Sequence, residues 1–117
     1  MNGCERMLNF IQQKPVDRLP FHPIIMRFAA RYAGVQYRDF CLDYRYKCAA
    51  MLICARDFGI DWVTVMSDPY AEAEAFGMQI DYPADNLPLP RNLLIMEPEN
   101  VDALILPEVD QNPRLLN

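Results

Sequence analysis

Residues 37–66, YRDFCLDYRYKCAAMLICARDFGIDWVTVM, decide the fold class of this chain. Over residues 37–58 apolar side chains recur at three- and four-residue steps with charged side chains elsewhere around the wheel, which predicts one long amphipathic helix. Gly59 follows directly and is typical of a helix C-terminus. Residues 62–66 form a short, β-branched apolar run, as expected of a parallel strand covered on both faces.

A second short apolar run precedes this helix. Residues 21–26, FHPIIM, predict a buried strand, provided that the missing N–H of Pro23 faces an unpaired direction. A strand, a long helix and a second strand make a βαβ unit, which is right-handed and belongs to an α/β fold. Upstream, the helical spacing of apolar residues in 5–13 predicts a short amphipathic helix.

The remaining chain carries weaker patterns. Residues 69–76 favour a short helix and residues 77–81 a strand, followed by a proline-rich extended excursion. We expect a return strand over residues 93–96 and a last helical stretch near residues 101–106. No strong periodicity is present in residues 107–117.

The charge balance limits the partners of the chain. It has 16 acidic and 11 basic residues, a formal net charge of −5 at pH 7, and no basic stripe, so we expect no nucleic-acid partner. No apolar run approaches the roughly 20 residues of a membrane span. The first residues also lack the basic and then apolar pattern of a secretory signal. We therefore expect a cytoplasmic protein without a membrane partner.

The four cysteines do not form a metal or redox motif. Three of them, Cys41, Cys48 and Cys54, fall within the predicted long helix, and neither C-x-x-C nor a Cys/His pair at metal spacing occurs. We interpret the cysteines as reduced, small apolar side chains. The single His22 does not build a metal site alone, so no metal site is predicted.

Two arginines follow the first predicted strand, where functional residues of parallel α/β folds collect. Arg27 and Arg31 are four residues apart, so in a helical turn both guanidinium groups project to the same side. Such a pair can clamp carboxylates bidentately. The alternative is a pair of surface arginines with acidic neighbours, which contributes about 0–1 kcal/mol per pair to stability.

An aspartate occupies the corresponding place after the second predicted strand. Asp68 lies between Ser67 and Pro69, a sequence typical of a helix start, so its carboxylate fits a capping role. It fits equally well as an active-site anion at the end of the strand. The sequence leaves these two interpretations open.

Several segments resemble the uroporphyrinogen decarboxylase family. Residues 26–32, MRFAARY, are similar to its MRQAGRY signature, and residues 67–68 and 75–78 are similar to its FSD and LGM motifs. Residues 5–8, ERML, and 15–20, PVDRLP, resemble the start of the family. The resemblance covers nearly the whole chain.

The resemblance implies a fold and a site. The fold is the N-terminal part of a (β/α)8 TIM barrel, incomplete, with residues 1–117 as a single partial domain. Carried over by these motifs, Arg27 and Arg31 are expected to bind carboxylates of a tetrapyrrole, and Asp68 is expected to be the catalytic residue against the pyrrole N–H groups. There a fixed carboxylate stabilises the protonated pyrrole through which an acetate side chain is decarboxylated in porphyrin and heme biosynthesis. The family uses neither metal nor organic cofactor for this reaction.

The sequence departs from the decarboxylase signature at several positions. Phe28 and Ala30 replace its glutamine and glycine, and residues 33–35, AGV, replace its LPE. The substrate is therefore open between a tetrapyrrole and a corrinoid, because the superfamily includes cobamide-dependent methyltransferases. A non-catalytic α/β interaction module is a third possibility.

The length of the chain sets a further expectation. A complete barrel of this type needs about 250 residues, against 117 here. We therefore expect the chain alone to be inactive, with its unpaired strand edges covered by the remainder of a barrel or by a second copy in a homodimer.

Overall fold

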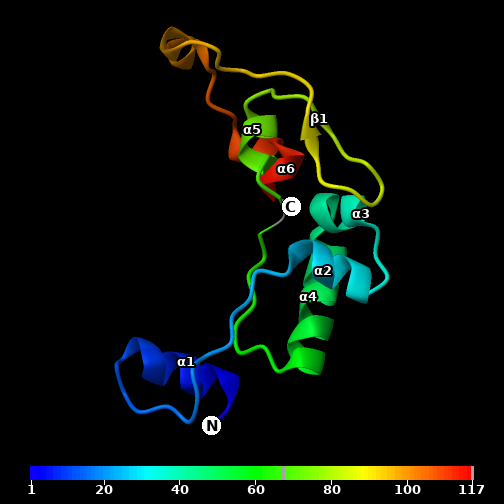
Figure 1. Cartoon of the computed structure of the whole chain (residues 1–117). Helices are drawn as coiled ribbons and strands as arrows, with labels where there is room; N and C mark the ends of the chain where they lie inside the picture. Colours follow the sequence, from blue (N-terminus) through cyan, green and yellow to red (C-terminus); the bar gives the residue numbers. More distant parts are fainter. Residues whose placement is uncertain (67, 117) are drawn as a thin grey trace.

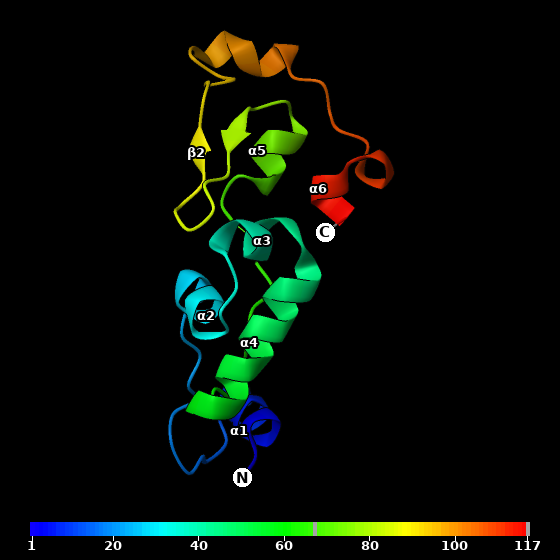
Figure 2. The same cartoon turned by 90° about the vertical axis from the view of Figure 1, so that its right-hand side faces the viewer.

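The computed structural model describes residues 1–66 and 68–116, and their arrangement is elongated (Figures 1 and 2). The radius of gyration is 17.7 Å and the principal extents are 51 × 34 × 25 Å, whereas a compact domain of 100 residues has a radius of about 13 Å. Helix α1 (Gly3–Ile11) occupies one end of the long axis and α5 (Ala71–Ala75) lies near the other. The core lies between them.

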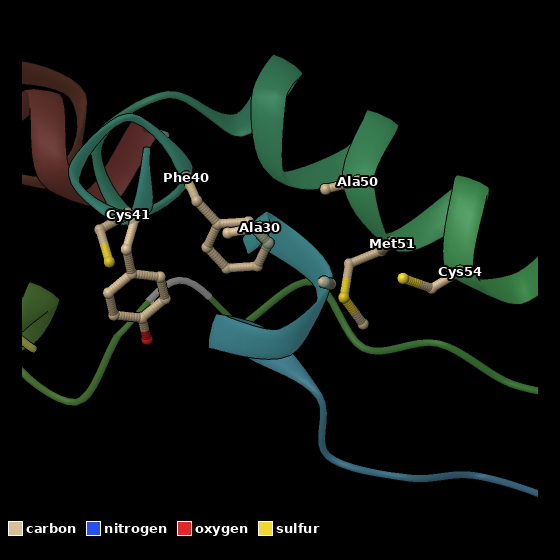
Figure 3. Close-up of a cluster of buried hydrophobic side chains, with 8 residues drawn as sticks. Ala30, Phe40, Cys41, Ala50, Met51 and Cys54 are labelled. Atoms are coloured by element: carbon tan, nitrogen blue, oxygen red, sulfur yellow. The ribbon is translucent and has the colours of Figure 1, made fainter. Parts of the chain in front are cut away.

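Three helices build this core: α2 (Met26–Tyr32), α3 (Tyr37–Leu42) and α4 (Tyr44–Phe58). They turn small or flat side chains toward one another, which lets the helix backbones approach closely (Figure 3). The buried cluster consists of Ala29, Ala30, Tyr37, Phe40, Cys41, Ala50, Met51 and Cys54.

The prediction of a single helix over residues 37–58 is wrong at one residue. Asp43 ends α3 and begins α4, with an extended backbone of φ −134° and ψ 113°. Its carboxylate accepts a hydrogen bond from the Arg45 N–H (2.9 Å), which satisfies a donor at the start of α4, as aspartate does at helix N-termini. The break turns α3 so that Phe40 and Met51 meet in the same cluster.

The predicted C-terminus of this helix is confirmed. Gly59 has the left-handed conformation φ 62°, ψ 38°, and its N–H bonds to the Ala55 carbonyl. Glycine adopts this conformation at little steric cost, whereas other residues are strained there. The chain therefore reverses after α4 and returns past the helices.

The two predicted parallel strands are extended segments without a strand ladder. Both segments run in the same direction past the helices (Figure 1), and the Asp61 N–H donates to the Phe21 carbonyl (2.9 Å). The first segment ends where α2 begins, at Met26. Within the described chain no further strand flanks this pair of segments, and a single parallel pair is weakly stabilised.

The extended segments nevertheless show the alternation of a covered sheet. Ile25 and Val63 pack against the buried cluster, whereas their neighbours Ile24 and Trp62 are 76% and 47% exposed. Successive side chains of an extended segment point to opposite faces. One face is thus covered by the helices and the other is open.

The carboxylate of Asp61 joins α1 to the two extended segments. It accepts from Arg6 on α1 (2.5 Å), from Arg18 (2.7 Å) and from the N–H of Phe21 (2.9 Å). Gly3 lies so close that an added Cβ would meet the Asp61 Cα at 3.0 Å. A side chain at position 3 would therefore push α1 away from this carboxylate.

Helix α1 begins two residues earlier than the predicted range of 5–13. Asn2 and Glu5 form a capping box, in which each side chain accepts a hydrogen bond from the backbone N–H of the other. The predicted helix is confirmed, and the missed cap explains its earlier start.

The C-terminal part contains short elements around a small sheet. Strands β1 (Ile80–Asp81) and β2 (Leu89–Pro90) pair antiparallel, so the strand predicted over residues 77–81 is shorter than expected. Residues 93–96, where a return strand was expected, form irregular structure after a proline-rich segment. The remaining elements are the 3-10 helices η1 (Pro98–Ala103) and η2 (Val109–Gln111) and the helix α6 (Pro113–Leu116).

The described chain is thus a mixed structure of helices with one two-stranded sheet, compatible with part of an α/β fold. The helix predicted in residues 69–76 is present as α5, and the one predicted near 101–106 is replaced by η1. Proline at the start of η1 is compatible with a first helical turn.

Adjacent residues of α4 offer a test of the core. Met51 is 2% exposed and Leu52 is 62% exposed, so Met51→Ala should lower the free energy of unfolding by about 2–5 kcal/mol. Leu52→Ala should change it by about 0.5 kcal/mol or less. Urea unfolding followed by circular dichroism measures both, and equal losses would contradict the placement of α4.

The Asp61 network predicts loss of stability in acid. The hydrogen bond from the Phe21 N–H holds the pKa of Asp61 below its ordinary 3.8, and the Arg6 hydrogen bond does the same for Asp17. Because the folded-state pKa values are lowered, this stability is present above pH 4 and is lost as the pH falls further.

We expect the urea midpoint to fall between pH 5 and pH 2, and to fall less in Asp61→Asn, which should already be weaker at pH 7. The exposed Asp110→Asn is the control and should follow the unchanged protein. An Asp61→Asn variant with the unchanged acid profile would contradict the role of this carboxylate.

Candidate functional site

Helix α2 carries the two predicted arginines on one face. Arg27 and Arg31 line a shallow open hollow of about 530 Å³ together with Phe28 and Tyr32. The helix is held by Ala29 and Ala30, which are fully buried against α3 and α4. Because these alanines face the core, the two arginines of α2 point outward.

The two guanidinium groups have unused donors. Arg27 donates through Nη2 to the Asp85 carbonyl (2.7 Å), and its buried Nε has no hydrogen-bond partner. Arg31 is exposed, and none of the described residues forms an ion pair with it. A buried donor without a partner is uncommon in proteins, so Arg27 and Arg31 are suited to an added anion.

Aromatic side chains lie beside the arginine pair. Phe28 stacks on Tyr32 with ring centroids 5.9 Å apart, and Phe58 from α4 lies 5.5 Å and 4.8 Å from these two rings. All three are about half exposed. The Tyr32 hydroxyl donates to Asp57 (3.1 Å), a hydrogen bond that raises the pKa of Tyr32. The surface next to the arginines is consequently apolar and ring-lined.

Asp68 is buried away from this hollow. Its side chain has no exposed surface, and Oδ1 accepts from the Tyr70 N–H (2.8 Å) just before α5. This contact is an Asx-turn that precedes the helix, whose N-cap is Tyr70 without a side-chain cap, so Asp68 does not cap α5 directly. In the described structure no hydrogen bond or ion pair links Asp68 to Arg27 or Arg31.

An arginine that sequence reasoning missed engages Asp68. Arg114 on α6 donates through Nη2 to Asp68 Oδ2 (2.5 Å) and to the Tyr82 hydroxyl (3.0 Å), and through Nε to Glu74 Oε2 (2.6 Å). Its Nη1 donates to the Cys41 carbonyl at the end of α3 (3.0 Å). No periodic pattern marks position 114, so only the folded chain brings it to Asp68.

Two further polar side chains surround Asp68. Lys47 is 2% exposed, and burial lowers the pKa of its amine. Burial raises the pKa of Tyr37, which the charge of Asp68 raises further and the charge of Arg27 lowers. Tyr37 therefore lies within electrostatic reach of both Asp68 and Arg27.

Metal and membrane sites are not found in the described chain. Residues 1–66 and 68–116 contain no cluster of three or more His, Cys, Asp or Glu side chains suited to a metal ion. All four cysteines are free thiols, with Cys41 and Cys54 in the core as predicted. Within the same ranges, every helix is too short or too polar to cross a bilayer.

Fold and site together define a protein with helices packed over extended chain, a candidate anion-binding surface on α2 and a buried carboxylate before α5. The chain belongs to the uroporphyrinogen decarboxylase (URO-D) family, because the model of that family matches residues 2–116. The match covers nearly the whole sequence and includes Arg27, Arg31 and Asp68. A comparison with curated protein sequences finds no match.

The buried thiol near Asp68 makes a reactivity prediction. Burial raises the pKa of Cys41 to about 11, so at pH 8 only about one thiol in a thousand is the reactive thiolate. Iodoacetamide should label the exposed Cys4 readily and Cys41 only after unfolding in urea. Mass spectrometry of the peptides measures both, and equal labelling of Cys4 and Cys41 in the folded protein would contradict this burial.

Proposed function

We propose that this chain supplies the carboxylate-binding part of a uroporphyrinogen decarboxylase-type enzyme with a (β/α)8 barrel. Arg27 and Arg31 bind acidic side chains of a tetrapyrrole, and Asp68 acts in its decarboxylation. The observation that carries the proposal is the pair of guanidinium groups on one face of α2 with unused donors.

The chemistry of guanidinium supports a carboxylate ligand. Its planar fork matches the two oxygens of a carboxylate, and Arg27 and Arg31 offer two forks one helical turn apart. Hydrogen bonds to charged groups contribute about 1.5–3 kcal/mol each. A ligand with several carboxylates can engage both arginines at once, which a single acetate ion does not do.

The surroundings of the arginines support a flat, apolar ligand body. The hollow of about 530 Å³ lies within the usual range of small-molecule sites, about 300–1,000 Å³. The rings of Phe28, Tyr32 and Phe58 offer faces for stacking. Because α2 alone lines the hollow, this chain covers one side of the ligand, and we expect weak binding and no turnover by the chain alone.

The proposed role of Asp68 is electrostatic. Loss of CO2 from an acetate side chain proceeds through a protonated, cationic pyrrole, and a fixed carboxylate stabilises the developing positive charge. Asp68 has the low exposure that strengthens such an interaction. In the described arrangement its second oxygen is engaged by Arg114, so this role requires a rearrangement.

A corrinoid is the second candidate ligand. Phe28 presents a half-exposed ring at the hollow, where the decarboxylase signature has a glutamine. This makes the surface more apolar and favours a ligand with fewer free carboxylates. Cobalamin, whose side chains are amides, therefore serves as the comparison in binding experiments.

Titration with uroporphyrin tests the proposed function, with the fluorescence of the porphyrin as the signal. We expect binding that Arg31→Ala weakens about tenfold and that Arg27→Ala, Arg31→Ala abolishes, because charge-assisted hydrogen bonds are lost. Arg38→Ala is the matched control, since Arg38 is exposed and pairs with Asp39.

The outcomes separate the two ligands. Uroporphyrin binding that is insensitive to both arginines would overturn the carboxylate clamp. Binding of cobalamin in preference to uroporphyrin, with loss in Phe28→Gln, would favour the corrinoid.

A further inference from the structure

Four oxygen atoms converge on the guanidinium group of Arg114. They belong to the carboxylates of Asp68 and Glu74, the hydroxyl of Tyr82 and the carbonyl of Cys41, at 2.5–3.0 Å from the three nitrogens. The guanidinium carbon also lies 5.3 Å from the centre of the Tyr82 ring. The oxygens come from α3, the chain before α5, α5 itself and the chain after β1.

These oxygens form a receptor for a planar N–H donor. Guanidinium presents its donors in a fixed plane, and Arg114 uses all three nitrogens here. Asp68 has no exposed side-chain surface, and both its oxygens are engaged, one by Tyr70 and one by Arg114. A ligand consequently has no access to the Asp68 carboxylate while Arg114 is in place.

We propose that Arg114 is a resident cation of the Asp68 site, so that Asp68 becomes accessible only when α6 withdraws Arg114. That a tetrapyrrole then takes the vacated place rests on the proposed function. The occupancy of the site by Arg114 does not depend on it.

The way α6 is held is compatible with withdrawal. The helix has four residues, none of them buried, and it packs against α5 and η2. Leu116 is 61% exposed. A helix this short has little stability of its own, so the polar contacts of Arg114 carry much of its attachment.

The charges explain why Arg114 occupies the site. Without Arg114, the buried Asp68 and the partly exposed Glu74 would lose the cation that they share, and an uncompensated buried carboxylate costs free energy. Lys47 lies within electrostatic reach of both Asp68 and Arg114. It remains as a cation near Asp68 when Arg114 leaves.

Carboxyl labelling tests the proposal on the whole chain. A water-soluble carbodiimide couples an amine to accessible carboxylates, and mass spectrometry of the peptides gives the rate at each position. In the unchanged protein Asp68 should react at least tenfold more slowly than the exposed Asp110. In Arg114→Gln the Asp68 rate should rise about tenfold or more.

Arg91→Gln is the matched control, because Arg91 is an exposed arginine paired with Asp81. It should leave the Asp68 rate unchanged. Reaction of Asp68 at the rate of Asp110 in the unchanged protein, or continued protection in folded Arg114→Gln, would overturn the proposal.

A second pair of variants applies if Arg114→Gln does not fold. Glu74→Gln removes one charged partner of Arg114 without uncovering Asp68 directly, whereas Glu72→Gln alters an exposed carboxylate of the same helix. The Asp68 rate should rise at least threefold in Glu74→Gln and stay unchanged in Glu72→Gln. Equal rates in the two variants would overturn the proposal. The labelling experiments use no porphyrin, so a failure of this proposal can be told apart from a failure of the proposed function in the uroporphyrin titration.

Discussion

The carboxylate of Asp61 is the contact on which the arrangement of the N-terminal half depends. The carboxylate accepts hydrogen bonds from Arg6 on α1, from Arg18 in the following loop and from the backbone N–H of Phe21. The backbone N–H of Asp61 in turn donates to the Phe21 carbonyl. Helix α1 and both extended segments therefore meet at one side chain. The second segment then continues past the helices, where its Val63 packs against the buried cluster. Gly3 belongs to the same constraint, since a side chain there would collide with Asp61.

Features of the fold that depend on local chemistry were predictable from the sequence. Gly59 ends α4 because a left-handed backbone is unstrained only for glycine. The first helix was recognised by the spacing of its apolar residues, and α5 by the helix-start sequence before it. The break at Asp43 was missed because the apolar period continues through it, although aspartate before a helical run is itself a capping signal. The strands at residues 21–26 and 62–66 were wrong for a different reason. A strand buried on both faces belongs to a sheet of several strands, and a sequence pattern reports burial and not the presence of those further strands.

The candidate site was likewise predictable from the sequence only where local spacing determines it. That Arg27 and Arg31 share a face follows from their spacing, and α2 confirms it. That Asp68 follows the second extended segment was also apparent, but its partner was not, because Arg114 is distant in the sequence and lies in a tail without periodicity. Only long-range packing brings the two together, and the arginine's neighbours come from four separate parts of the chain. The match to the family model shows that the chain belongs to the uroporphyrinogen decarboxylase family.

The contacts of Arg114 have a consequence for how the sequence can vary during evolution. Asp68, Glu74 and Arg114 share one enclosed group of charges, so loss of the arginine leaves two carboxylates without a counterion, and loss of a carboxylate leaves a cation under-neutralised. Substitutions at these positions are therefore expected to be inherited together, with a change of charge at 114 accompanied by a change at 68 or 74. Relatives that keep Asp68 but lack a basic residue at the position of Arg114 would have to neutralise the aspartate by another route, and Lys47 is a buried cation within electrostatic reach of it.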